Sequence, residues 1–213
     1  MDPEIAAVIG GCAFLALWYG GGHLLNRRRG QRLFRWLERG LDTLEGKREA
    51  GWLGSPASGA RVNILHADPP FRRLEITLLL ANREIPVLWL LDHLRGKRDR
   101  LIIRATLRSP QHTEIMVYPT GGRTHQQPDS WVQQEGPHGL SVAFQGRGSA
   151  SQVAALMSWL QTYGTHLQHF AWHKTDPHIH MQMDMGGLAT MSSETFLADL
   201  QAAIGTIEKN NAH

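Results

Sequence analysis

The chain has 213 residues, 42% of them hydrophobic, and its 22 Lys and Arg exceed its 19 Asp and Glu by only three charges. A domain of about 150 residues can bury one hydrophobic core, and the single cysteine, Cys12, excludes an intrachain disulfide. The positive excess is local, because residues 27–49 carry eight basic and four acidic side chains, whereas residues 60–213 carry fourteen and thirteen. A domain so close to neutrality does not predict a nucleic acid partner.

The segment from Ile5 to Leu25 contains no Asp, Glu, Lys or Arg. An apolar run of about 20 residues is long enough to cross a bilayer core as a helix. We therefore predict a transmembrane helix over residues 1–26. A cleaved secretory signal is the alternative, but such signals begin with basic residues and end with small ones. This chain begins with Asp2 and Glu4, and its basic residues follow the apolar run.

Three arginines, Arg27, Arg28 and Arg29, come directly after the apolar run. Basic residues next to a membrane span favour the cytoplasmic side. The sequence therefore predicts a single-pass protein of the cell membrane, with its N-terminus outside and its domain in the cytoplasm. A domain without cysteine is compatible with that compartment.

Residues 27–59 are predicted to form a basic amphipathic juxtamembrane helix and a linker. The helical stripe consists of Leu33, Leu37, Leu41 and Leu44. A helix lying in the headgroup plane would present this pattern, although a helix packed on the domain or continuing the anchor would present it too. We favour the headgroup plane, and the Gly- and Ser-rich residues 49–60 as the linker. The residues predicted to contact anionic headgroups are Arg27, Arg28, Arg29, Arg32, Arg35 and Arg39.

The remaining residues alternate between strand and helix patterns. We predict strands at 61–67, 72–81, 100–108, 112–118, 131–134, 139–145, 166–173 and 178–185, and helices at 86–95, 151–163 and 193–208. Pro86 suits a first helical turn, and Gly96 suits a helix stop. The predicted fold class is α+β: an N-terminal transmembrane helix followed by an antiparallel sheet domain with helices on one face.

The domain is predicted to have two α+β halves, residues 60–122 and 123–213. The order of elements suggests two ββαββ repeats, residues 60–122 and 123–185. A shift of 66 residues places Leu74 on Leu140 and Leu90 on Leu156. If the halves arose by duplication, their strands should pair in the same order.

Three short segments give the chain a resemblance to a known group of proteins. They are Trp52-Leu53-Gly54-Ser55, Pro86-Val87-Leu88-Trp89-Leu90-Leu91 and Arg95-Gly96-Lys97-Arg98-Asp99. Through them, residues 5–120 resemble a family of prokaryotic single-pass membrane proteins with one small soluble domain. No activity is assigned to that family, so the resemblance implies no catalytic residue.

Histidines provide the strongest chemical signal, because five of the twelve lie between residues 166 and 180. In a strand, His178 and His180 point to one face, and such a pair can hold a transition metal. A four-residue hairpin loop would bring His169 and His173 to the same face, whereas a three-residue loop would separate them. We favour the alternative in which these histidines form a solvated polar face and no metal is bound. Substituting His178 or His180 should then change stability by less than about 0.5 kcal/mol.

Two further segments have a functional and a structural interpretation. Gly146 to Ser151 follows a strand and opens a helix, as phosphate-binding loops do, but a tight turn with a serine N-cap is favoured. The basic residues 95–100 follow a predicted helix, where cations stabilise the C-terminus. A contact with the membrane surface or an acidic partner is the alternative.

The sequence contains none of the motifs G-x-S-x-G, C-x-x-C and H-E-x-x-H. We therefore predict a membrane-anchored cytoplasmic binding or accessory module without catalytic activity or cofactor, whose partners are the membrane and an unidentified protein. One alternative is a metal-dependent enzyme or sensor that uses the 166–180 histidines. Another is a domain that binds anionic lipids.

Overall fold

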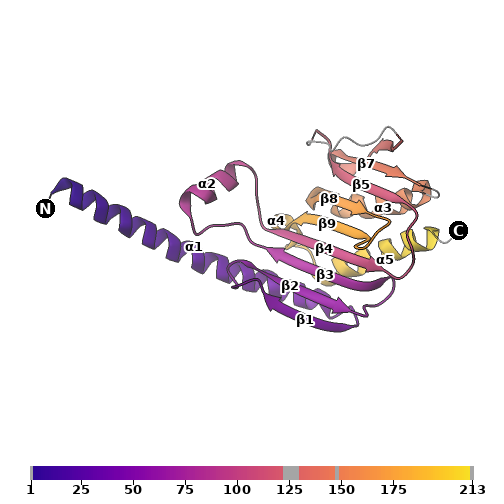
Figure 1. Ribbon diagram of the computed structural model, residues 1–213, viewed down its shortest axis with the longest axis horizontal. Coiled ribbons are helices and arrows are strands. Elements are labelled where there is room, and N and C mark those ends of the chain that lie inside the picture. Colours follow the sequence, from indigo (N-terminus) through magenta and orange to yellow (C-terminus); the bar gives the residue numbers. More distant parts are fainter. Residues whose placement is uncertain (1, 122–129, 147–148, 212–213) are drawn as a thin grey trace.

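The computed structural model describes residues 2–121, 130–146 and 149–211. It has one long N-terminal helix followed by a nine-stranded antiparallel sheet with helices, so the predicted α+β class is confirmed (Figure 1). The helices are α1 (Pro3–Leu41), α2 (Pro86–Leu94), α3 (Ser149–Tyr163), α4 (Met185–Leu188) and α5 (Ser193–Asn211). The strands are β1 (Lys47–Trp52), β2 (Gly59–Leu65), β3 (Phe71–Leu79), β4 (Arg100–Leu107), β5 (Glu114–Pro119), β6 (Val132–Glu135), β7 (Leu140–Gln145), β8 (Leu167–Trp172) and β9 (Ile179–Asp184).

The strands are ordered β1-β2-β3-β4-β9-β8-β5-β7-β6, and every pair is antiparallel. Alternating apolar residues make this register favourable, because they line up across the sheet on one face. One such row crosses seven strands and consists of Val62, Ile76, Ile103, Met181, Phe170, Val117 and Val142. Each member of this row is at most 1% exposed, so the row forms the part of the core that the sheet contributes.

Three helices cover that apolar face: α3, α5 and the second half of α1, which lie behind the sheet in Figure 1. Phe196 of α5 joins them, with its ring 6.2 Å from Trp36 of α1 and 5.3 Å from Tyr163 of α3. The opposite face of the sheet carries no helix within the residues that the structure describes. Its side chains are mostly polar and partly exposed.

The helix predicted to lie in the headgroup plane packs on the domain instead. Helix α1 continues without interruption to Leu41, and Leu33, Trp36 and Leu37 are at most 4% exposed in the core. The in-plane interpretation is therefore wrong, because an apolar helix stripe fits the face of a sheet as well as it fits a bilayer. The predicted linker is also wrong in its first half, since residues 47–52 pair with β2 as an edge strand.

The two halves of the domain differ in how their strands pair, which contradicts the proposed duplication. Strand β3 pairs directly with β4, whereas β5 lies between the corresponding strands β7 and β8. Helix α3 packs against the sheet, whereas α2 buries none of its residues. The order of elements along the chain follows from local sequence patterns, and these patterns do not determine which strands become neighbours.

Candidate functional site at the domain end of the projecting helix

The first half of α1 projects away from the sheet and ends in the N-terminus (Figure 1). Its apolar side chains are open to the surroundings, with Val8 65% and Leu17 77% exposed. Residues 5–25 would extend for about 31 Å as a helix, which matches the hydrocarbon core of a bilayer. Within the described residues, this is the one helix long and apolar enough to cross a membrane.

Where α1 reaches the domain, its backbone lies directly against neighbouring main chain. A Cβ atom at Gly22 would lie 2.2 Å from the carbonyl oxygen of Arg83, and one at Gly30 would lie 1.9 Å from that of Pro56. Both distances are far shorter than any contact a side chain tolerates, so only glycine fits. Asn26 lies between the two glycines and is 2% exposed.

A buried ionic cluster joins α1 to the two segments that flank α2. We call it the Asp99 latch, and it consists of Asn26, Arg29, Arg83, Asp99 and the main chain of Ala81. The carboxylate of Asp99 is 1% exposed and accepts hydrogen bonds from Arg83 Nη1 at 2.9 Å, Arg83 Nη2 at 3.2 Å and the Ala81 N–H at 2.9 Å. It also accepts a hydrogen bond from Arg29 Nε.

Asn26 completes the latch from the helix side. Its Nδ2 donates to the Ala81 carbonyl at 3.0 Å, and its Oδ1 accepts from Arg83 Nη1 at 2.8 Å. Burial raises the pKa of the Asp99 carboxyl, but the hydrogen bonds from Arg83, the Ala81 N–H and Arg29 outweigh it and hold this pKa below its ordinary value. Asp99 is therefore ionised at neutral pH, and its carboxylate pairs with the guanidinium groups of Arg29 and Arg83.

The sequence contained little that could have revealed this latch. Arg29 and Asp99 are separated by 70 residues, so no local pattern relates them. The only local signal is the spacing of Gly22, Asn26 and Gly30, which places three small or polar residues on one helix face.

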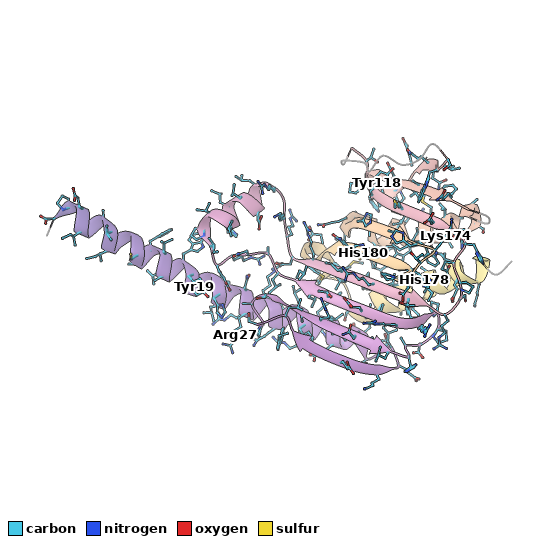
Figure 2. The ribbon with its side chains drawn as sticks, viewed as in Figure 1. Tyr19, Arg27, Tyr118, Lys174, His178 and His180 are labelled. Atoms are coloured by element: carbon cyan, nitrogen blue, oxygen red, sulfur yellow. The ribbon has the colours of Figure 1, made fainter. Side chains whose placement is uncertain are left out.

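The six arginines predicted to contact headgroups occupy different environments. Arg29 belongs to the latch, while Arg27 and Arg28 are exposed at the end of the apolar segment. Figure 2 shows Arg27 close to where α1 meets the sheet. The exposed residues Arg32, Arg35 and Arg39 follow along the second half of the helix. Because an α-helix rises 1.5 Å per residue, Arg39 lies about 18 Å beyond Arg27.

The basic residues after α2 contact carboxylates close to them. Lys97 Nζ lies 2.8 Å from Asp92 Oδ1, and Arg98 Nε lies 3.7 Å from Asp184 Oδ2. Glu84 precedes α2, and its Oε1 lies 2.9 Å from Nδ1 of His23 on α1. This contact joins α1 to the segment before α2 in addition to the latch.

The predicted histidine cluster is shaped by a four-residue hairpin loop. The His173 N–H donates to the His178 carbonyl at 2.7 Å, and the rings of His169 and His180 lie 5.8 Å apart. Figure 2 shows His178 and His180 on the sheet. The described part of the chain nevertheless contains no group of three or more His, Cys, Asp or Glu side chains that could hold a metal ion.

His178 is not simply a solvated residue, as the sequence had suggested. Its Nδ1 accepts the Leu107 N–H at 3.0 Å and so extends the hydrogen-bonding edge of β4 beyond its pairing with β9. Burial lowers the pKa of His178, against the opposing charges of Asp176 and Glu208. A lowered pKa agrees with this bond, because Nδ1 can accept a hydrogen bond only in the neutral ring.

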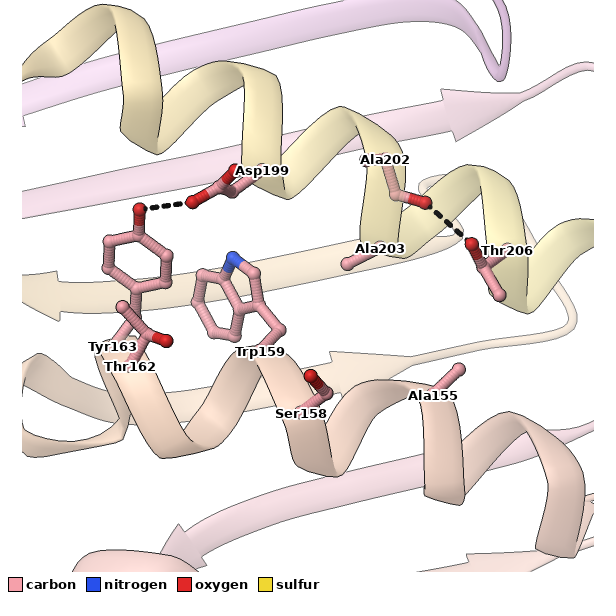
Figure 3. A pocket seen from close by; sticks show the side chains of 9 residues that line it. All are labelled: Ala155, Ser158, Trp159, Thr162, Tyr163, Asp199, Ala202, Ala203 and Thr206. Atoms are coloured by element: carbon pink, nitrogen blue, oxygen red, sulfur yellow. Dashed lines mark hydrogen bonds between the residues drawn. The ribbon is translucent and has the colours of Figure 1, made fainter.

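A groove of about 450 Å³ runs between α3 and α5 (Figure 3). The Tyr163 hydroxyl donates to Asp199 Oδ2 at 2.7 Å, and Thr206 Oγ1 donates to the Ala202 carbonyl at 2.9 Å. Burial and the Asp199 carboxylate raise the pKa of Tyr163, so this hydroxyl stays protonated at neutral pH. The Tyr163–Asp199 bond joins the two helices, whereas the Thr206–Ala202 bond lies within α5.

The candidate phosphate loop at Gly146 to Ser151 cannot be compared with the structure, because residues 147 and 148 lie outside the described residues. The sequence matches no protein-family model, and a search of curated proteins finds no significant similarity. The function is therefore argued from the geometry of α1, the latch and the sheet.

Proposed function

We propose that this chain is a single-pass membrane protein whose cytoplasmic domain is a binding or accessory module without catalytic activity. One observation carries the proposal: α1 is a single helix whose first half is apolar and uncovered, while its second half lies in the domain core. The basic residues after the apolar half favour the cytoplasm for the domain and the outside for the N-terminus.

This arrangement attaches the domain rigidly to its membrane anchor. A flexible linker would let the domain sample many orientations, whereas α1 and the Asp99 latch hold it at one angle to the anchor. The uncovered face of the sheet is then presented at a fixed distance from the bilayer. That face carries charges of both signs, such as Glu75 with Arg61 at 3.7 Å and Arg104 at 3.6 Å. Mixed charge of this kind suits the polar surface of a protein partner.

The orientation is tested with two reporters fused in turn after His213. One reporter is fluorescent only when it folds in the cytoplasm, and the other is enzymatically active only outside. We expect fluorescence from the first and no activity from the second. The reverse result would refute a cytoplasmic domain, and recovery of either fusion from the soluble fraction would refute the anchor.

A second function, binding of anionic lipid headgroups, is supported by the exposure of Arg27 and Arg28 at the end of the apolar segment. A basic residue near an anionic surface contributes about 1 kcal/mol. We expect Arg27→Gln and Arg28→Gln to reduce the fraction of spin-labelled phosphatidylserine that the full chain immobilises in vesicles, and added salt to reduce it further.

Arg39→Gln is the matched control, because Arg39 is an exposed arginine about 18 Å further along the same helix than Arg27. It should leave the immobilised fraction unchanged. Equal losses from all three substitutions would argue against contact at the membrane boundary.

A further inference from the structure

Helix α2 is an apolar element that the domain leaves uncovered. It lies in the connection between β3 and β4, and none of its residues is buried. The exposed fractions are 66% for Val87, 50% for Leu90 and 73% for Leu94, and Ile85, Leu88 and Leu91 are each at least 40% exposed. A water-soluble domain rarely leaves so many neighbouring apolar side chains open, so this patch indicates an interaction surface.

The position of α2 indicates what covers it. The helix stands beyond the ends of β3 and β4, beside the projecting half of α1 (Figure 1). Trp89 contacts Trp18, with ring centroids 5.6 Å apart. Trp18 precedes Arg27 by nine residues, so this contact lies about 13 Å along the helix from the arginines, within the apolar segment.

The polar groups around α2 are arranged for such a location. Its residues from Pro86 to Leu91 carry no charge, and Pro86 at the first turn has no N–H to satisfy. The flanking acidic side chains have close partners: Glu84 Oε1 lies 2.9 Å from His23 Nδ1, and Asp92 Oδ1 lies 2.8 Å from Lys97 Nζ. Backbone bonds close the C-terminal turn, including the Arg95 N–H to the Leu91 carbonyl at 3.1 Å. Main-chain groups that are paired within the helix cost less in hydrocarbon than unpaired ones.

We propose that α2 is immersed in the bilayer leaflet that the second part of the apolar segment crosses. With nine residues it is too short to span the membrane, and apolar segments of such length occur as interfacial or re-entrant elements. The inference rests on the proposed membrane span of α1. Its consequence is a two-point attachment: α1 alone would let the domain rotate about the helix axis, whereas an immersed α2 fixes that rotation and the direction in which the uncovered sheet face points.

Site-directed spin labelling of the full chain in phospholipid vesicles tests this proposal. In a Cys12→Ala background, single labels are introduced by Val87→Cys and Leu94→Cys on α2. Molecular oxygen concentrates in hydrocarbon, whereas a nickel chelate stays in water. We expect both α2 labels to collide more with oxygen than with the chelate. Val132→Cys on the distant strand β6 is the matched control, because Val132 is also apolar and 56% exposed, and its label should show the reverse preference.

A label at Val8→Cys separates failure of this inference from failure of the proposed function. Val8 lies in the projecting half of α1 and is 65% exposed. If the Val8 label is in hydrocarbon while the α2 labels contact the chelate, the span stands and the immersion of α2 is refuted. If all three labels contact the chelate, the span itself is refuted. If the α2 labels are shielded from both reagents and broaden one another, a second copy of the chain covers α2, and the proposal is overturned.

Discussion

Asp99→Asn should destabilise the domain although it removes only a charge. Asp99 is 1% exposed and accepts two hydrogen bonds from Arg83, one from the Ala81 N–H and one from Arg29. The asparagine amide has one acceptor oxygen, and its NH₂ group would face the two guanidinium groups. The substitution therefore removes acceptors from two arginines and places donors against donors.

The size of the loss follows from the exposure of the two arginines. Breaking a fully buried ion pair costs about 3–5 kcal/mol, and a hydrogen bond to a charged group contributes about 1.5–3 kcal/mol. Arg83 is 24% exposed and Arg29 is 41% exposed, so both can recover part of their solvation by turning toward water. We therefore expect Asp99→Asn to lower the free energy of unfolding by about 2–3 kcal/mol.

Urea unfolding of the full chain in detergent micelles, followed by tryptophan fluorescence, measures this change. Asp42→Asn is the matched control, because Asp42 pairs with Arg48 at 3.1 Å but is 77% exposed. It should cost less than about 0.5 kcal/mol. An equal effect of the two substitutions would show that the latch does not stabilise the domain.

The pH dependence provides an independent check on the same variant. Because the folded-state pKa of Asp99 lies below the ordinary value of 3.8, ionised Asp99 stabilises the fold fully above that value. This contribution is lost as the pH falls through the lower folded-state pKa. The difference between wild type and Asp99→Asn should therefore stay constant from neutral pH down to about pH 5. A difference that had vanished by pH 5 would refute the lowered pKa.

Three further predictions concern the close helix contact and one histidine. Gly30→Ala should destabilise the domain by about 1–3 kcal/mol despite the better helix propensity of alanine, whereas Gly20→Ala, with nothing within 4 Å of its Cβ, should cause no loss in the same urea titration. His178→Ala should cost about 1 kcal/mol at pH 8, because the Leu107 N–H loses its acceptor. The folded-state pKa of His178 is lowered, so below pH 6.5 the unfolded wild type binds a proton more readily than the folded wild type. The wild type therefore loses stability as the pH falls below 6.5, and the cost of His178→Ala should shrink. A pH-independent cost would contradict the neutral, hydrogen-bonded ring.

Much of the secondary structure was predictable, because local periodicity reports which residues face a core. Each predicted strand and helix of the domain has a counterpart whose ends lie within three residues of the prediction. The one-turn helix α4 and strand β1 have no predicted counterpart. The residues Lys47–Trp52 of β1 are all exposed and show no apolar alternation. Such a strand is defined by its hydrogen bonds to β2, and no pattern within residues 47–52 indicates them.

The candidate site was predictable only in part. The apolar segment and the arginines after it are contiguous, so the sequence shows them directly. Arg29 was predicted to contact headgroups, but it faces Asp99, which lies far away in the chain. The run from Val87 to Leu91 is apolar and too short to span a membrane, and in the sequence this pattern fits a core helix as well as a contact surface. The structure excludes the core helix, because no residue of α2 is buried.

The sequence by itself determined the α+β class, an N-terminal helix long and apolar enough to cross a membrane, and the positions of most strands and helices. These properties depend on residues that are neighbours along the chain, and hydrophobic periodicity records them. The tertiary structure alone decided the strand order, the burial of the Leu33–Leu41 stripe against the sheet, the Asp99 latch and the exposure of α2. Each of these depends on contacts between distant residues, and a helix stripe or an isolated carboxylate has the same sequence pattern whether its partner is protein, lipid or water.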